Sequence, residues 1–427
     1  MARERKPKPR YQHVERRQMQ WCGLSLDQRL PPDHVARDVW EYCQGLDLSA
    51  LYDQIQTVED GPGRSPVDPR VLLALWLLAT IDGVGAAREL DRLCTHHTAY
   101  LWLLGGCTVN YHLLSDFRHQ HVDFLDDLLK HSVAAMDHQG LIELNSVAQD
   151  GMRVRASAGQ SSFRREESLE DCLAKAEAHL AEVKARANDN DHQKQAAEER
   201  GARDRSERIQ AALAEHQKLA AKKEARKKGS GKTARASTTD PEARVMKMAD
   251  GGFRPAYNVQ FATTTGSRVI VGVDVVNEGT DGGQMLPMLE QLEQHYGRRP
   301  ESYFADGSFC KLDDITALER RGVEVYLPVM EKKQQEEKGV DPYAKKKGDT
   351  PEVAGWRERM GTAEAQKLYP ERASTAEFSN AGCRNRGLYQ FQVRGLLKVR
   401  AVCLWHALAH NFQRLRGLQR PSPAPAT

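Results

Sequence analysis

The chain up to residue 140 has the pattern of apolar and polar positions that predicts helices. The segment Pro69 to Ala79 is apolar on every side, which indicates a buried helix, and Asp68 directly before it is the expected N-cap. Shorter helical patterns follow at Ala86 to His96 and at Leu113 to His121, with glycines between them as breakers. We therefore expect an all-helical N-terminal domain.

The pattern changes to strict alternation around Asp150. In an extended backbone the even-numbered residues from 148 to 154 share one side, so Asp150 lies on an apolar face. An unpaired carboxylate there would cost roughly several kcal/mol, which predicts a partner, a proton or a metal ion. Asp306 repeats this pattern at the end of a short apolar run, and Glu377 follows in a helix-forming stretch.

The rest of the chain after residue 240 predicts a mixed sheet. Alternation at 257–261, a turn at 264–267 and an apolar run at 268–276 indicate a hairpin, and Thr280 or Asp281 is the expected cap of the next helix. Further signals predict a strand ending at Asp306, a helix at 312–321 and a strand at 323–329. The resulting order of elements is that of a ribonuclease-H-like fold, in which the first strand is central and adjoins the fourth.

A charged segment, Arg164 to Thr239, interrupts this pattern. Its apolar residues recur at spacings of four and three, which predicts an antiparallel helical hairpin with a turn near Asn188. Its exit, Lys222 to Lys232, is expected to be a basic flexible linker. We favour self-association over DNA contact as the role of the hairpin.

Composition narrows the classes of function. The 427 residues suffice for two or three domains, and the mean hydropathy of −0.64, without an apolar run near 18 residues, argues against a membrane protein. The eight cysteines form no Cys-x-x-Cys pair, which fits a reducing cytoplasm. Net charge is only +3, but basic clusters occur at Arg3 to Arg17, at Lys222 to Lys232 and near the C-terminus. They suit contact with a polyanion or, alternatively, are solvated tails and helix faces.

Several other candidates have simpler explanations. His406 and His410 stand four apart, but packing and a solvent-facing histidine explain them better than zinc. Asp274 belongs to the third strand, and Asp250 precedes two glycines and predicts a turn. No phosphate-binding Gly-x-x-x-x-Gly-Lys motif occurs, so we expect no nucleotide cofactor. If the N-terminal helices include a helix-turn-helix, the basic residues facing DNA would be Arg88, Arg92, Arg118 and His119; packing or dimerisation is the alternative.

Motifs over nearly the whole chain resemble the DDE transposases of bacterial insertion sequences, in the branch with a helical N-terminal domain. The segments that carry the resemblance are Pro66 to Trp76, Gly83 to Cys94, Asp116 to Arg118, Gln149 to Ala156, Met248 to Gln260, Ala305 to Ser308 and Tyr369 to Glu377. The last is the most specific, because a tyrosine and an arginine precede the third acidic residue in this family. The family's following basic residue corresponds to Arg384 here.

The resemblance implies a metal site and a reaction. Asp150, Asp306 and Glu377 would be the catalytic acids and hold two Mg²⁺ ions, for which Mn²⁺ can substitute, about 3.5–4 Å apart. Arg372 and Arg384 would hold phosphates, and Tyr369 would position the DNA backbone or stack on a base. The expected reaction is cleavage at terminal inverted repeats followed by transfer of the 3′ ends to target DNA. The alternatives are a nuclease of the same fold without strand transfer, and an inactive DNA-binding relic or regulator.

We accordingly divide the chain into a helical DNA-binding or dimerisation domain at 1–140, a catalytic domain at 141–163 and 240–418, the insertion at 164–239 and a disordered tail at 419–427. Expected partners are the double-stranded DNA of transposon ends and target, bound by a homodimer in the bacterial cytoplasm at the nucleoid. Besides the motif residues, the expected DNA contacts are Arg254, Asn258, Lys222, Lys223, Arg226, Lys227, Lys228 and Arg118.

Overall fold

The computed structural model describes residues 23–56, 65–186 and 192–419. The described residues before residue 140 form helices and connecting loops only, as expected. Asp68 caps the central helix of this part by accepting a hydrogen bond from the Arg70 amide at 2.8 Å, and nearly every residue of that helix is buried. The eight helices are α1 Leu26–Arg29, α2 Val35–Gln44, α3 Ser49–Tyr52, α4 Pro69–Ile81, α5 Ala87–His96, α6 Thr98–Leu104, α7 Tyr111–Gln120 and α8 Val122–His138.

A mixed six-stranded sheet forms the core of the second part. Its order is β4-β5-β1-β7-β8, and β6 also pairs with β5. β1 is antiparallel to β5 and parallel to β7, which confirms the ribonuclease-H-like arrangement with a central first strand. The sequence pattern did not predict β4. The strands are β1 Ser146–Arg155, β4 Arg244–Lys247, β5 Phe253–Thr264, β6 Ile270–Val276, β7 Ser302–Phe304 and β8 Glu324–Tyr326.

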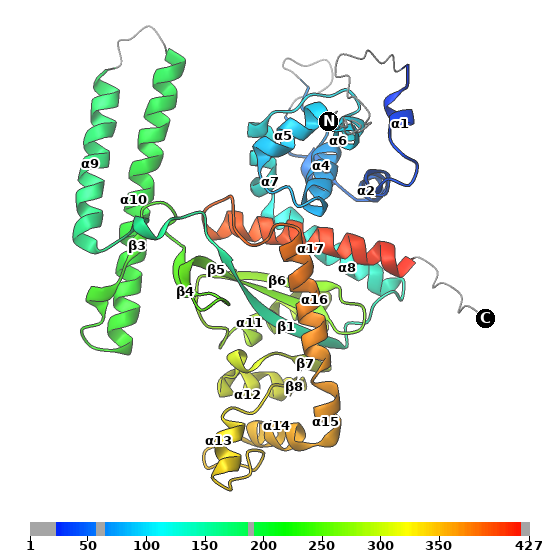
Figure 1. Cartoon of the computed structure of the whole chain (residues 1–427), viewed down its shortest axis with the longest axis vertical. Helices are drawn as coiled ribbons and strands as arrows, with labels where there is room; N and C mark the ends of the chain where they lie inside the picture. Colours follow the sequence, from blue (N-terminus) through cyan, green and yellow to red (C-terminus); the bar gives the residue numbers. More distant parts are fainter. Residues whose placement is uncertain (1–22, 57–64, 187–191, 420–427) are drawn as a thin grey trace, which may run out of the picture.

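Two long helices connect the sheet to its surroundings. In Figure 1, α17 and α8 lie between the N-terminal helices and the sheet, and α16 runs past the sheet toward α15. α17 contacts β6 on one side and α4, α7 and α8 on others, and α16 contacts both β1 and β5. The helices of this part are α11 Met285–Tyr296, α12 Leu312–Arg320, α13 Lys332–Glu337, α14 Pro351–Gly361, α15 Ala363–Leu368, α16 Glu371–Asn385 and α17 Leu396–Gln419.

Two expectations about these helices are wrong. α11 begins at Met285 after Gln284, so neither Thr280 nor Asp281 caps it, and Asp281 is instead buried. His406 and His410 are 7 % and 2 % exposed, because α17 is covered on opposite sides by the N-terminal helices and the sheet. Burial lowers the pKa of His406 to about 3 and that of His410 to about 4, so both are neutral.

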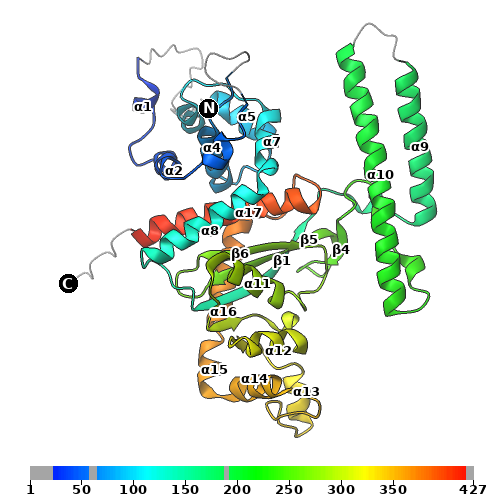
Figure 2. The ribbon, with the colours of Figure 1, turned by 180° about the vertical axis from the view of Figure 1, so that it is seen from behind.

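The insertion is a helical hairpin that projects from the sheet (Figures 1 and 2). Its helices, α9 Glu166–Ala185 and α10 His192–Arg226, pack through small and apolar side chains. A two-stranded sheet of β2 Phe163–Arg164 and β3 Ala236–Ser237 closes its base. The predicted turn near residue 188, the basic cluster at 3–17 and the tail from residue 420 lie outside the described residues.

The exit of the hairpin is not the flexible linker that its composition predicted. Lys222 and Arg226 belong to the last turns of α10. Glu224 accepts hydrogen bonds from the amides of Gly229 and Gly231 at 2.7 and 2.9 Å, which fixes the following turn. Lysine, arginine and alanine are good helix formers, so this basic run extends the helix. None of the described helices has the length and apolar character needed to cross a lipid bilayer.

Candidate active site

Asp150 and Asp306 meet because they occupy matching positions along two neighbouring parallel strands, β1 and β7. Ala148 on β1 pairs with Phe304 on β7. Asp150 comes two residues after Ala148, and Asp306 comes two residues after Phe304. Asp150 lies within β1, opposite Phe261 of β5, and Asp306 lies just beyond the end of β7, so the two residues stand side by side. Asp306 lies two residues after β7 and caps a short 3₁₀ turn, where its side chain accepts a hydrogen bond from the Ser308 amide.

The Asp150 carboxylate is in an unfavourable electrostatic environment. Burial, and then the nearby charge of Asp306, raise its pKa to about 6, while Arg372 acts in the opposite direction. The Arg372 guanidinium lies 3.9 Å from Asp150 Oδ1, which is too far for a hydrogen bond. The negative charge of this pair is thus only partly compensated by protein groups. A bound cation would relieve it.

The helix α16 and the turn before it close the site from one side. Asn380 donates a hydrogen bond from Nδ2 to Asp150 Oδ2 at 2.8 Å, and the Tyr369 hydroxyl donates to the Ala305 carbonyl at 3.2 Å. Four sequence-predicted residues, Asp150, Asp306, Tyr369 and Arg372, are therefore brought together. Sequence reasoning missed Asn380. Its position eight residues after Arg372 could have indicated it, because that spacing places both side chains on neighbouring faces of one helix.

Glu377 lies on the same helix, three residues before Asn380, and is exposed. Within the described residues, no three His, Cys, Asp or Glu side chains are grouped closely enough to hold a metal ion. The structure thus brings the two aspartates together and leaves Glu377 about one helical turn from the residue that contacts Asp150.

The groups around the two aspartates suit a hard divalent cation. Asp306 Oδ1 accepts hydrogen bonds from the Ser308 amide and hydroxyl at 2.7 and 2.5 Å, which leaves Oδ2 without a donor among the described residues. The Asn380 Oδ1 atom is buried and also has no partner there. Carboxylate and amide oxygens are the ligands that Mg²⁺ and Mn²⁺ prefer. Asp150 and Asp306 are the residues that could hold such an ion.

The predicted DNA contacts lie in different environments. Arg384 is exposed near the end of α16, and Arg226, Lys227 and Lys228 are exposed at the end of the hairpin. Arg254 pairs with Asp250 at 2.8 Å across the predicted turn, and Lys222 pairs with Glu278 at 2.5 Å. Lys223 donates to Thr233. Asn258 is fully buried and donates to Asp281, so it lies inside the molecule and away from a DNA-facing surface.

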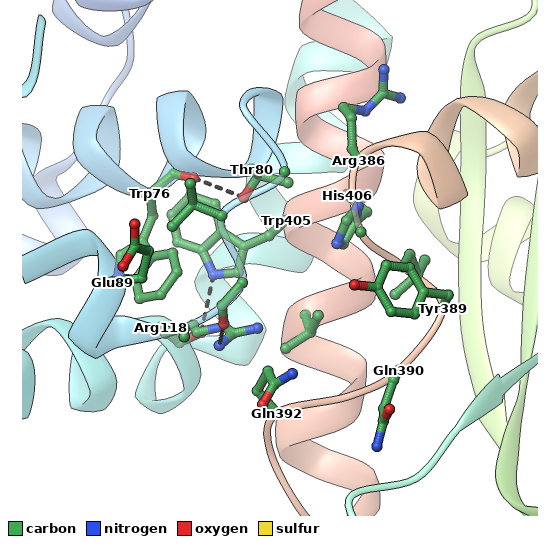
Figure 3. Close-up of a pocket in the computed structure, with 17 residues that line it drawn as sticks. Trp76, Thr80, Glu89, Arg118, Arg386, Tyr389, Gln390, Gln392, Trp405 and His406 are labelled. Carbon is green, nitrogen blue, oxygen red and sulfur yellow. Dashed lines mark hydrogen bonds between the residues drawn. The ribbon is translucent and has the colours of Figure 1, made fainter. Parts of the chain in front are cut away.

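Arg118 lies in a cavity of about 230 Å³ between the N-terminal helices and the segment from α16 to α17 (Figure 3). It is 7 % exposed, donates a hydrogen bond to the Gly85 carbonyl, and stacks 4.9 Å from the Trp76 ring centre. Burial lowers its pKa to about 10. The Trp405 indole donates to the Arg118 carbonyl at 3.0 Å. Arg118 therefore joins the two parts of the molecule at their seam.

A ribonuclease-H-like core with two carboxylates at matching positions of adjacent parallel strands is typical of enzymes that act on phosphodiesters. Comparison with protein families specifies the class further. Residues 220–412 match the model of a "Transposase DDE domain", and residues 24–120 match a "Transposase domain (DUF772)". The chain belongs to the DDE transposases typical of bacterial insertion sequences. It is a DNA transposase, an enzyme class that acts on DNA and uses divalent metal ions.

The matched regions divide the candidate acids. Asp306 and Glu377 fall within the DDE match, whereas Asp150 lies in the interval between the two matches. For Asp150 the argument is therefore the register between β1 and β7. No curated protein and no solved structure gives a significant match to the chain.

Proposed function

We propose that this transposase cuts DNA at terminal inverted repeats and joins the freed 3′ ends to target DNA, with Asp150, Asp306 and Glu377 as its catalytic acids. The observation that carries the proposal is the meeting of Asp150 and Asp306 beside Arg372. Glu377 would complete the set by turning toward Asp150, because Asn380, one turn later, already contacts that carboxylate.

Asp150, Asp306 and Glu377 would together hold two divalent metal ions. When bound, two Mg²⁺ ions, or Mn²⁺ in their place, supply activation of the attacking oxygen and charge neutralisation at the leaving oxygen. Asn380 and Arg372 orient the Asp150 carboxylate from the helix side. The partial burial of Asp150 strengthens the attraction for a cation, since fewer waters compete for its charge.

Basic and aromatic residues near the acids would hold the DNA. Arg372 and Arg384 would bind phosphate oxygens, and Tyr369 would support the backbone or a base beside the cut. The exposed basic end of the hairpin would add sequence-independent contacts through Arg226, Lys227 and Lys228. The other proposed DNA contacts are Lys222, Lys223, Arg254 and Arg118. Arg118 could reach DNA only if the N-terminal helices moved away from the segment between α16 and α17.

We further infer that the enzyme acts as a homodimer in the bacterial cytoplasm, at the nucleoid. The projecting hairpin supports self-association, because it leaves two long helices in contact mainly with each other. The division into a helical domain at 1–140, a catalytic core at 141–163 and 240–418, and an insertion at 164–239 follows the same elements. Sedimentation with and without end DNA tests the dimer, and a hairpin deletion that still dimerises would contradict this role.

A strand-transfer assay with labelled end DNA tests the reaction. Joined product is the expected result, and hydrolysed ends without joining would indicate a nuclease instead. Glu377→Gln is expected to lower product formation by about 10²-fold or more, because a metal ligand is lost. Glu371→Gln is the matched control, since Glu371 is also exposed on α16. Equal activity of both variants would remove Glu377 from the acid set.

A further inference from the structure

Asp281 is a buried carboxylate on the opposite face of β1 from Asp150. Its side chain is 1 % exposed, and Oδ1 accepts hydrogen bonds from Asn258 at 2.7 Å and Gln260 at 2.9 Å. Arg153 lies 2.7 Å from Oδ2. Gly151 and Arg153 are on this face because side chains alternate along β1, so the strand separates Asp281 from Asp150.

The approach of Asp281 to β1 depends on the glycine beside Asp150. A Cβ atom at Gly151 would lie 2.1 Å from Asp281 Oδ1 and 2.7 Å from the Gln260 amide nitrogen. Only glycine leaves room for this carboxylate against the strand. Gln260 in turn accepts a hydrogen bond from Gln149 at 2.9 Å, and Gln149 accepts one from the Tyr303 hydroxyl at 2.6 Å. Asp281 is thus fixed to three strands.

Ser308 connects Asp281 to the candidate metal ligand Asp306. The Ser308 hydroxyl oxygen is 2.9 Å from Asp281 Oδ2 and 2.5 Å from Asp306 Oδ1. A hydroxyl has one proton, so the two carboxylates share it in a three-centre hydrogen bond. The Ser308 amide also donates to Asp306 Oδ1 at 2.7 Å. Asp281 thus fixes the position of Ser308, and Ser308 fixes the Asp306 carboxylate. Rotation of that carboxylate would break both of its hydrogen bonds to Ser308.

We propose that Asp281 is a positioning residue for the transposase reaction. Through Ser308 it holds the Asp306 carboxylate with Oδ1 bound to the protein, so that Oδ2 would be free to bind a metal ion. The proposal rests on the proposed role of Asp306 as a metal ligand. Asp281 itself is not a ligand, because four donors already occupy its two oxygens and it is enclosed on the far face of the strand.

Ser308 gives the most direct test, because the residue is exposed and Ser308→Ala removes only the hydroxyl that links the two carboxylates. Ser308→Ala is expected to weaken Mn²⁺ binding, measured by calorimetry on the DNA-free protein, by about 10–100-fold, the range found for groups that orient metal ligands. Strand transfer should fall by a similar factor. Ser308→Thr keeps the hydroxyl and should stay within about threefold of the parent in both measurements.

A second turn of the same kind, formed by Asp47 and Ser49, provides a matched control. Ser49 donates from its amide and its hydroxyl to Asp47 Oδ1, at 3.0 and 2.5 Å, on the surface of the helical part. Ser49→Ala removes the same kind of hydrogen bond far from the site. It should leave Mn²⁺ affinity and strand transfer unchanged. A loss equal to that of Ser308→Ala would show that the effect has nothing to do with Asp306 and would overturn the proposal.

Asp281→Asn tests whether Asp281 acts through Ser308. The substitution replaces one carboxylate oxygen by NH₂. This group must face either Asn258 and Gln260 or Arg153 and Ser308, all of which are donors. The link to Ser308 is therefore weakened, and Mn²⁺ affinity should fall about tenfold. The double variant with Ser308→Ala should be no worse than Ser308→Ala alone. If the two losses multiply instead, Asp281 acts independently of Ser308 and the proposal fails.

Asp306→Asn separates failure of this inference from failure of the proposed function. If Asp306→Asn abolishes Mn²⁺ binding while Ser308→Ala binds Mn²⁺ as the parent does, the metal site stands and the positioning role of Asp281 is wrong. If Asp306→Asn binds Mn²⁺ normally and still joins DNA, the proposed site itself is wrong.

Discussion

The two faces of β1 hold carboxylates in opposite ways. On the α16 face, burial and the charge of Asp306 raise the pKa of Asp150 to about 6. On the other face, burial alone would raise the pKa of Asp281 as well, but hydrogen bonds from Asn258 and Gln260 and the charge of Arg153 hold it below the ordinary value. Burial of an acid alone therefore does not mark a candidate metal site; at Asp150 a second carboxylate, Asp306, lies close by and protein groups compensate the charge only in part.

The largest expected effect is on activity and concerns Asp150, on the face of β1 where protein groups compensate the carboxylate only in part (the uncompensated face). Asp150→Asn should reduce strand transfer by about 10³-fold or more, because a proposed metal ligand is lost and no neighbouring acid replaces it. Binding of end DNA, measured by fluorescence anisotropy, should remain within a few fold. Asp274→Asn is the control, since Asp274 is a carboxylate on β6 outside the site. Comparable activity of both variants would end the distinction between the two faces.

The compensated face should show its effect in stability. Asp281→Asn should lower the free energy of unfolding by about 3 kcal/mol, because buried donors lose a charged acceptor and Arg153 loses its partner. The measurement is urea unfolding of the metal-free protein. The same substitution at Asp150 should not destabilise it. A stable Asp281→Asn variant would mean that the internal hydrogen bonds do not compensate Asp281 as we describe.

The sequence was sufficient to predict the uncompensated face but not the compensated one. The order of elements placed Asp150 and Asp306 on adjacent parallel strands, and the register between Ala148 and Phe304 bears this out. Asp281 precedes an apolar helical pattern, as a cap would, and only tertiary contacts with Gly151 and β5 distinguish the two cases. Likewise Ser308 gives no signal, because the turn at Asp47 and Ser49 has the same local pattern on the surface.

Burial was the second feature that local patterns did not reveal. The pattern around His406 and His410 is that of a helix with one apolar side, whereas α17 is covered by the N-terminal helices and by the sheet. That second covering surface comes from residues some 300 positions earlier in the chain, such as those of α4. The basic run after Lys222 was misjudged for a related reason: the helix ends where Glu224 caps the turn, and charge alone does not mark that position.

The contrast between the faces predicts a pH dependence with a definite sign. Folding raises the pKa of Asp150 from 3.8 to about 6, so the folded protein binds the proton more tightly than the unfolded chain. The stability of the metal-free protein is therefore highest at acid pH with respect to this group, and it falls as the pH rises from about 4 through about 6. Asp150→Asn removes this loss and should be more stable than the parent by about 2–3 kcal/mol at pH 7.

The difference between variant and parent is the quantity to measure, by urea unfolding at pH 4.5 to 7.5. It cancels His406 and His410, whose lowered pKa values make stability fall as the pH decreases. The gap should widen with pH. Added Mg²⁺ should close it at pH 7 by stabilising the parent alone, in proportion to the logarithm of its concentration. A gap that is constant with pH would contradict the uncompensated charge of Asp150.

The smallest expected effect extends the same contrast to arginines. Arg153 is committed to Asp281, whereas Arg384 is exposed and has no carboxylate partner among the described residues. Arg384→Ala should weaken binding of end DNA only a few fold near physiological salt, and should lower the slope of log affinity against log salt by about one. Arg320→Ala is the control, because Arg320 is exposed but pairs with Glu352 at 2.9 Å. An unchanged slope for Arg384→Ala would mean that Arg384 does not contact phosphate. Internal compensation would then distinguish the two faces of β1 without indicating where DNA binds.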